Sequence, residues 1–185
     1  MASVFGVDKL KGTISNLGGF AKGNRYNVSF TKYPAGLTGG AATVGDLQYL
    51  CETVSLPTKS LAGVAHDMYG PPREIPYRET FTDAALSFIL DDAFTVKKFF
   101  DSWQTKIVNP ITNNVNYWDN FTGTINISRL SNAANDFEFT SNKYNIQLIE
   151  AYPSVVGEIA LGHALGTDVL KLSVTFKYRR WNFLP

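Results

Sequence analysis

The stretch that decides the fold is Tyr144-Asn-Ile-Gln-Leu-Ile-Glu-Ala-Tyr-Pro-Ser-Val-Val-Gly-Glu-Ile159, followed after a loop by Val169-Leu-Lys-Leu-Ser-Val-Thr-Phe-Lys-Tyr178. In both segments apolar residues alternate with polar ones, which is typical of a β-sheet with one buried face. We therefore expect two long strands that flank a connector containing Pro153. Neither segment carries residues spaced for catalysis, so the pattern favours a protein that associates with other chains over an enzyme.

Length and composition fit one globular domain with an arm. The chain has 185 residues, of which 44% are hydrophobic and 18% charged, so global disorder is not expected. Its formal net charge is +1, whereas domains that bind nucleic acid are usually clearly basic. The N-terminus has no basic region followed by an apolar run, and no apolar stretch approaches the ~18 residues of a membrane span. We expect neither a secretory signal nor membrane insertion.

The first 24 residues read as an N-terminal arm, and residues 25–185 as a β domain. The arm has apolar residues at helical spacing, which predicts a short amphipathic helix that needs a partner to dock on. These residues are Val4, Val7, Leu10, Ile14 and Leu17. Beyond the arm, strands are expected over 26–33, 48–54, 84–90, 124–130 and 137–140, a flexible glycine-rich loop over 34–46, and an irregular segment over 112–120.

One helix is expected between the strands. Asp91 or Asp92 would cap its N-terminus, and Asn109-Pro110 would end it. Its apolar stripe is interpreted as core packing against the sheet and consists of Val96, Phe99, Phe100, Trp103 and Ile107. Several strands, one helix and further strands, without alternation of the two, predict a mainly β fold: an antiparallel sandwich or barrel packed against a single helix.

Residues 58–80 form a separate feature, a long hairpin or projecting loop. Two weakly extended segments flank the rigid Gly70-Pro71-Pro72 turn. Because such a loop can reach a neighbouring molecule, its tip is a candidate for self-assembly. The tip residues are Tyr69, Gly70, Pro71, Pro72 and Arg73.

The sequence shows no set of residues spaced for catalysis, cofactor binding or metal binding. His66 and His163 are each expected in a Gly/Ala-rich loop, without metal ligands at a suitable spacing. Cys51 lies among apolar residues, which predicts a small buried side chain without an activating neighbour. The Asp91-Asp92 pair at a helix start is better explained as a cap than as an acid and base pair. We expect no enzyme.

The order of segments resembles the tail tube proteins of contractile-tailed bacteriophages and, more distantly, the tube proteins of type VI secretion. The resemblance covers about residues 17 to 181. It includes Gly19-Phe-Ala-Lys-Gly-Asn24, the Phe99-x-x-x-Trp103 spacing and, most specifically, Tyr152-Pro-Ser-Val-Val-Gly-Glu-Ile159. The sequence departs from the family at 34–46, at 112–142 and in the tail Trp181–Pro185.

The resemblance implies a virion protein of a phage tail, assembled in the cytoplasm of the host bacterium. Six subunits would form a ring around a continuous inner barrel. The rings would stack into a hollow tube that contacts sheath and baseplate proteins and passes DNA without sequence-specific binding. A baseplate ring that initiates the tube shares the fold and remains open as an alternative, although such proteins often carry an extra domain. A monomeric ligand-binding β-barrel is the competing class.

Overall fold

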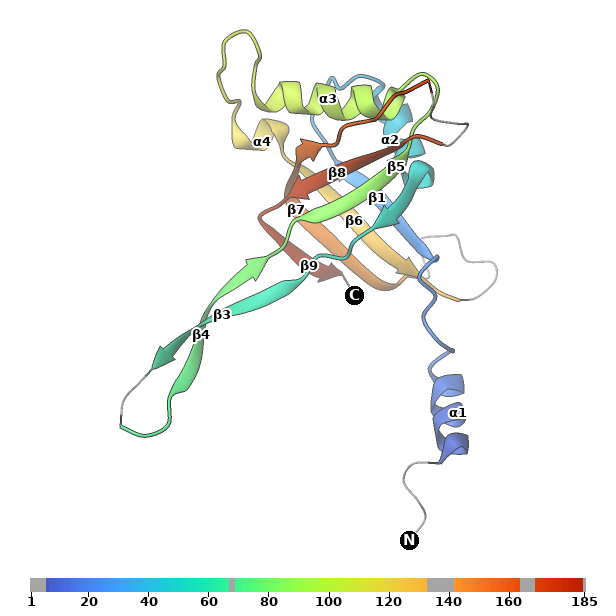
Figure 1. Ribbon diagram of the computed structural model, residues 1–185, viewed down its shortest axis with the longest axis vertical. Helices are drawn as coiled ribbons and strands as arrows, with labels where there is room; N and C mark the ends of the chain where they lie inside the picture. The colour runs from blue at the N-terminus through green and yellow to red at the C-terminus, as the bar shows by residue number, and fades with distance from the viewer. Residues whose placement is uncertain (1–5, 67–68, 133–141, 164–168, 185) are drawn as a thin grey trace.

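The computed structural model describes residues 6–66, 69–132, 142–163 and 169–184 (Figure 1). The described part is mainly β, with nine strands and four helices. In chain order these are α1 (Val7–Asn16), β1 (Tyr26–Lys32), α2 (Gly40–Leu50), β2 (Cys51–Val54), β3 (Lys59–His66), β4 (Arg73–Phe81), β5 (Ala84–Ile89), α3 (Thr95–Ile107), α4 (Trp118–Phe121), β6 (Gly123–Leu130), β7 (Asn142–Val156), β8 (Lys171–Lys177) and β9 (Arg180–Leu184).

Seven strands form one antiparallel sheet in the order β1-β6-β7-β8-β5-β2, with β9 also paired to β7. Strands β3 and β4 form a separate two-stranded sheet. The predicted antiparallel, mainly β class is therefore confirmed. Among the described residues β1 and β2 end the sheet and do not pair with each other, so the protomer contains no closed barrel.

The long strand β7 takes part in both halves of this sheet. One edge of β7 pairs with β6, while the other pairs first with β9 and then with β8. Between those two parts Glu150 has a φ of 56°, and the register with β6 shifts there. The guanidinium of Arg179, in the link from β8 to β9, lies 3.0 Å from the Glu150 carboxylate. The bulge at Glu150 thus bends β7 so that it serves both halves of the sheet.

The sequence predicted that Pro153 lies in a connector between two strands, and this prediction is wrong. Pro153 lies inside β7 and pairs with Phe176 of β8. Since β6 begins opposite Ala151, no strand among the described residues pairs with the other edge of β7 at Pro153. A proline, which lacks an N–H, is tolerated where a strand has a free edge.

The core lies between the sheet and α3. Phe100 of α3 packs against Phe88 of β5 and Phe176 of β8, with ring centroids 5.2 and 5.8 Å apart. Phe30 of β1 contacts Phe176 at 6.0 Å, so the two halves of the sheet meet through aromatic rings. On α3 the fully buried residues are Val96, Phe99, Phe100 and Trp103, while Ile107 is partly buried against the same core.

The start of α3 differs from the expected cap. The residue before the helix is Phe94, with a left-handed φ of 55°. Asp91 accepts hydrogen bonds from the Thr95 backbone N–H at 2.8 Å and from the Thr95 hydroxyl at 2.5 Å. The hydrogen bond from the Thr95 hydroxyl outweighs the opposing effect of burial and holds the pKa of Asp91 below its usual value. Asp91 lies outside the helix and therefore accepts a hydrogen bond from one of the backbone N–H groups that have no partner within the first turn.

The expectation of a single helix is wrong. The predicted flexible loop over 34–46 contains the start of α2, which runs to Leu50, so the predicted strand over 48–54 begins only at Cys51. Leu47 is fully buried, and Val44 and Leu50, three residues away on either side, are partly buried. The packing of these side chains outweighs the low helix propensity of the glycines. Likewise α4 lies in the segment expected to be irregular, and the tail forms β9. The strand expected over 137–140 lies outside the described residues.

Two elements project from the body on the side away from α3: the helix α1 and the β3–β4 hairpin (Figure 1). The hairpin continues the β2 and β5 strands, and the Thr58 and Thr82 hydroxyls pair at 3.1 Å at its base. Both projections leave the compact core, so they are the natural places to look for contacts with other molecules.

Candidate assembly surfaces

The helix α1 has no buried residue. Its apolar residues Val7 and Leu10 are 68% and 60% exposed, and Leu17 at its end is 78% exposed. Ile14 is half-buried, and Val4 lies outside the described residues. An isolated helix of 10 residues is marginal in water, so its exposed apolar residues favour a partner.

The arm joins the body through Gly18 and Gly19, which have left-handed φ values of 79° and 88°. Asn132, next to the end of β6, donates a hydrogen bond of 2.7 Å to the Phe20 backbone carbonyl. Asn132 thus anchors the joint to the body, while none of the residues of α1 is buried.

The β3–β4 hairpin is exposed on both faces. Leu61, Val64, Ile75 and Tyr77 are all more than half exposed, although aliphatic and aromatic side chains are common in strands because they pack. A two-stranded sheet is marginally stable alone. The hairpin therefore has the composition of a strand pair that is covered in an assembly.

The residues predicted at the hairpin tip lie where the sequence suggested. Tyr69 is fully exposed, and Gly70 turns the chain with a φ of 113°. Pro71 and Pro72 follow the turn, and Arg73 begins β4. These tip residues thus lie on one projection, the β3–β4 hairpin, and the described residues of the arm lie on the other, at α1 (Figure 1). Sequence reasoning missed the apolar side chains along the hairpin, because its strands do not alternate strictly.

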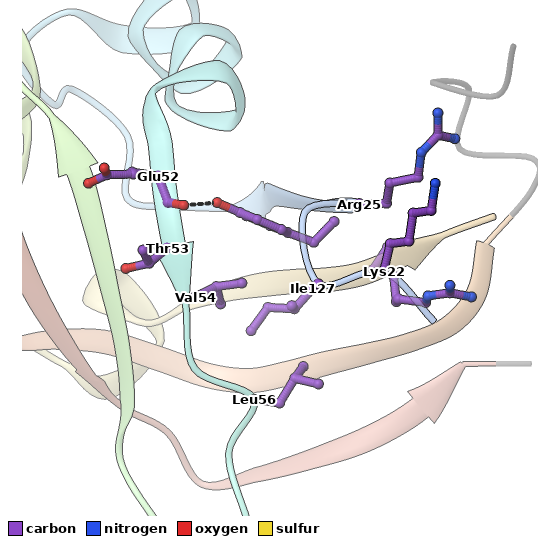
Figure 2. Close-up of a pocket in the computed structure, with 11 residues that line it drawn as sticks. Lys22, Arg25, Glu52, Thr53, Val54, Leu56 and Ile127 are labelled. Atoms are coloured by element: carbon purple, nitrogen blue, oxygen red, sulfur yellow. Dashed lines mark hydrogen bonds between the residues drawn. The ribbon is translucent and has the colours of Figure 1, made fainter. Parts of the chain in front are cut away.

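A cavity of about 280 Å³ marks the seam where β1 and β2 approach without pairing. The Tyr26 hydroxyl crosses this seam and donates to the backbone carbonyls of Cys51 and Glu52. The bond to Glu52 is the dashed line in Figure 2. Burial, with smaller effects of Cys51 and Glu52, raises the pKa of Tyr26. Apolar and basic side chains line the cavity, among them Val54, Leu56, Ile127, Lys22, Arg25 and Arg129.

A second polar cluster lies at the bend of β7. The Glu150 carboxylate accepts a hydrogen bond of 2.8 Å from the Trp118 indole and one of 3.0 Å from Arg179. The Trp118 bond first, and Arg179 second, lower the pKa of Glu150. The sequence shows no sign of this cluster, because its three members come from distant segments. It holds α4 against the bend.

The residues considered for catalysis are not brought together. Cys51 is buried at the start of β2, and burial raises its pKa to about 12, so its thiol is neutral and protected. His66 ends β3 and does not lie in a loop, and both it and His163 are exposed. Within the described ranges no three His, Cys, Asp or Glu residues are grouped as metal ligands. None of the helices in this part of the chain has the length and apolar character of a membrane span.

Comparison with protein families matches residues 21–184 to the family described as phage tail tube protein. No curated protein sequence matches the chain.

Solved structures with a similar fold come from contractile injection systems. One is a chain of the PVC sheath-tube complex of an extracellular contractile injection system in the extended state, with a TM-score of 0.62 and 18% identity over 89% of this chain and 91% of that one. Another is from the cap that terminates the tube of the anti-feeding prophage, with a TM-score of 0.62 and 14% identity over 89% and 91% of the two chains. A third, from the baseplate of the anti-feeding prophage, six-fold symmetrised, has a TM-score of 0.58 and 14% identity over 89% and 95%. At these identities the similarity shows the fold alone.

Proposed function

The chain belongs to the phage tail tube protein family, and on this premise we propose that it is the subunit of the inner tube of a phage-type contractile tail. Six copies form a ring, and rings stack into a hollow tube. The observation that carries the proposal is the family match over 21–184 together with two projections that expose apolar side chains.

The open sheet supports ring formation. Strands β1 and β2 end the sheet at a seam that the Tyr26 hydroxyl bridges without a strand ladder, and in the described part of the chain β9 pairs on one edge alone. Unpaired edges are an aggregation hazard unless they are paired or covered. A ring removes such edges by having each subunit contribute strands to one continuous inner barrel. The barrel of the family is thus a property of the ring, which fits a protomer whose own sheet does not close.

Six-fold symmetry and DNA passage complete the proposal. The similar chain from the anti-feeding prophage comes from a six-fold symmetrised baseplate, which supports six subunits here. A formal net charge of +1 fits a lumen that lets DNA pass without holding it. The sheath and the baseplate are the expected partners, and the tail of the virion, assembled in the host bacterial cytoplasm, is the expected location.

The two projections have separate roles in this proposal. The arm, residues 1–24, docks the apolar side of its helix on a neighbouring subunit, while residues 25–185 form the tube domain. The hairpin reaches the next ring with its tip, Tyr69 to Arg73. Light scattering and native mass spectrometry on purified protein test the proposal, because the expected species is a multiple of six subunits of 20.4 kDa.

A ring at the end of the tube is the second candidate. Chains with the same fold occur in a sheath-tube complex, a baseplate and a terminating cap, with TM-scores between 0.58 and 0.62. A cryo-EM map of the particle separates the roles. Tens of stacked copies per tail support the tube subunit, and one ring per tail supports a baseplate initiator.

A monomeric ligand-binding barrel is the weaker candidate. The space between sheet and α3 is filled by Phe30, Phe100, Trp103 and Phe176, whose ring centroids lie 5.8 to 6.4 Å apart in the contacts they make. A stable monomer at high concentration, with no rings seen by negative stain, would favour this candidate over the tube.

A further inference from the structure

The β3–β4 hairpin has two faces of different charge. In an antiparallel pair, residues directly opposite each other share a face, and neighbours along a strand alternate. The register therefore assigns Val64 and Ile75 to one face and Leu61 and Glu79 to the other. Tyr77 lies at the bulge between Pro76 and Arg78 and is assigned to neither face.

We name the two surfaces by their charged residues. The arginine face consists of Ser60, Ala62, Val64, His66, Arg73, Ile75, Arg78 and Thr80. The glutamate face consists of Lys59, Leu61, Gly63, Ala65, Glu74, Pro76, Glu79 and Phe81.

Side-chain contacts agree with this assignment. The Ser60 and Thr80 hydroxyls, both on the arginine face, lie 2.6 Å apart. On the glutamate face Lys59 Nζ lies 2.6 Å from Glu79 Oε1. A Cβ added to Gly63 would lie 2.4 to 2.8 Å from three atoms of the Glu74 side chain, so Glu74 lies across Gly63 on the glutamate face.

The charges on the two faces are neutralised only in part within the protomer, where Lys59 pairs with Glu79. In the part of the chain that the structure describes, Arg73, Arg78 and Glu74 form no ion pair. The arginine face thus has two arginines and no acid, and the glutamate face has two glutamates against one lysine. Each face also exposes apolar surface, from Val64 and Ile75 on one side and Leu61 on the other.

The outer edge of β4 is poorly suited to strand addition. Pro76 lies in this strand, and the register shifts between Ala62 and Gly63 opposite it. Proline and bulges are the features by which natural proteins keep edge strands from extending a ladder. A partner of the hairpin therefore meets its faces and not the edge of β4.

We infer that the arginine face of one subunit packs on the glutamate face of the next, so that Arg73 and Arg78 pair with Glu74 and Glu79 of a second copy of this chain. Two complementary faces on one element make a heterologous contact, which repeats around a ring or from ring to ring. This inference rests on the proposed tube function. It names the residues that determine which surface of a neighbour the hairpin accepts.

The test uses two charge-reversed variants and their mixture. Arg73→Glu with Arg78→Glu makes both faces acidic, and Glu74→Arg with Glu79→Arg makes both faces basic. Each variant alone is expected to need about tenfold or more protein to assemble at low salt, because every contact then joins like charges. A 1:1 mixture restores opposite charges at every contact and should assemble like the wild type. Lys98→Glu with Lys106→Glu on α3 is the control for the Arg→Glu variant, with the same change in net charge at the opposite end of the molecule (Figure 1).

Each outcome is read by light scattering and negative stain, with circular dichroism to verify folding. Recovery of rings or of stacks in the mixture supports the inference. Assembly of both variants like the wild type, or a mixture that stays unassembled, overturns the inference and leaves the tube function intact if the wild type assembles. A wild type that remains monomeric overturns the tube function itself. If a reversed variant does not fold, Arg73→Gln with Arg78→Gln replaces it, and an unchanged salt dependence of assembly then overturns the inference.

Discussion

At the residue scale, Trp103 is the centre of the core. It is fully buried, its indole N–H donates a 2.7 Å hydrogen bond to the Phe121 carbonyl, and its ring packs against Phe99 and Phe176. Trp103→Ala should lower the free energy of unfolding by about 3–5 kcal/mol, because a large cavity remains under α3. Urea denaturation measures the loss. Trp118→Ala, at a half-exposed position, is the control with a smaller effect, and equal effects would contradict this view of the core.

The close approach of two strands explains why the segment that resembles the tube family has a glycine at position 157. The Gly157 N–H donates a 2.7 Å hydrogen bond to the Ser173 carbonyl, and an added Cβ would lie 2.8 Å from that oxygen. Gly157→Ala should therefore destabilise the protein by about 1–3 kcal/mol through overpacking. Gly45→Ala is the matched control, since a Cβ there meets nothing within 4 Å inside α2 and should stabilise by up to about 1 kcal/mol. Thermal melts of both variants check the opposite signs.

Ionisation of Tyr178 should lower the stability of the folded protein at high pH. Burial, and secondarily Asp83, raises the pKa of Tyr178 from 10.0 to about 12, while its hydroxyl donates to the Thr82 carbonyl at 2.6 Å. The folded state thus favours the neutral phenol. Its stabilising effect is complete below a pH of about 10 and is lost as pH rises towards 12. Tyr178→Phe should lose less Tm over this range than the wild type. Tyr49→Phe, at an exposed position, should follow the wild type; equal slopes for all three proteins would refute the assignment.

At the scale of elements, the arm and the core should separate cleanly. Deleting residues 1–17 removes α1, which has no buried residue, so the β signal in circular dichroism should remain. Assembly should weaken, because the arm's apolar side chains then no longer dock on a neighbour. Circular dichroism and size-exclusion chromatography of the truncated chain measure both effects. A loss of β structure would mean that the arm belongs to the core.

Strands with a strict alternation could be predicted from the sequence, and elements whose formation depends on distant contacts could not. The alternation over 124–130 and 169–178 predicted β6 and β8 nearly to their ends. By contrast, α2 forms among glycines because Leu47 packs into the core, and β9 forms because β7 offers it a free edge. The projecting hairpin was expected, but its two charged faces depend on a bulge that only the register reveals.

At the scale of the whole molecule, the protomer combines a filled core with surfaces that have no partner within it. Its sheet does not close, its hairpin exposes both faces, and its N-terminal helix stands away from the body (Figure 1). Each of these features fits a subunit whose contacts are completed by copies of itself. We therefore expect the chain to assemble into stacked rings.

Cryo-electron microscopy of the purified protein at high concentration and low salt tests that claim most directly. We expect rings with six-fold symmetry that stack into hollow tubes, with the β3–β4 hairpin of each subunit against a neighbouring copy. Dispersed particles of a single 20.4 kDa chain under the same conditions would contradict it.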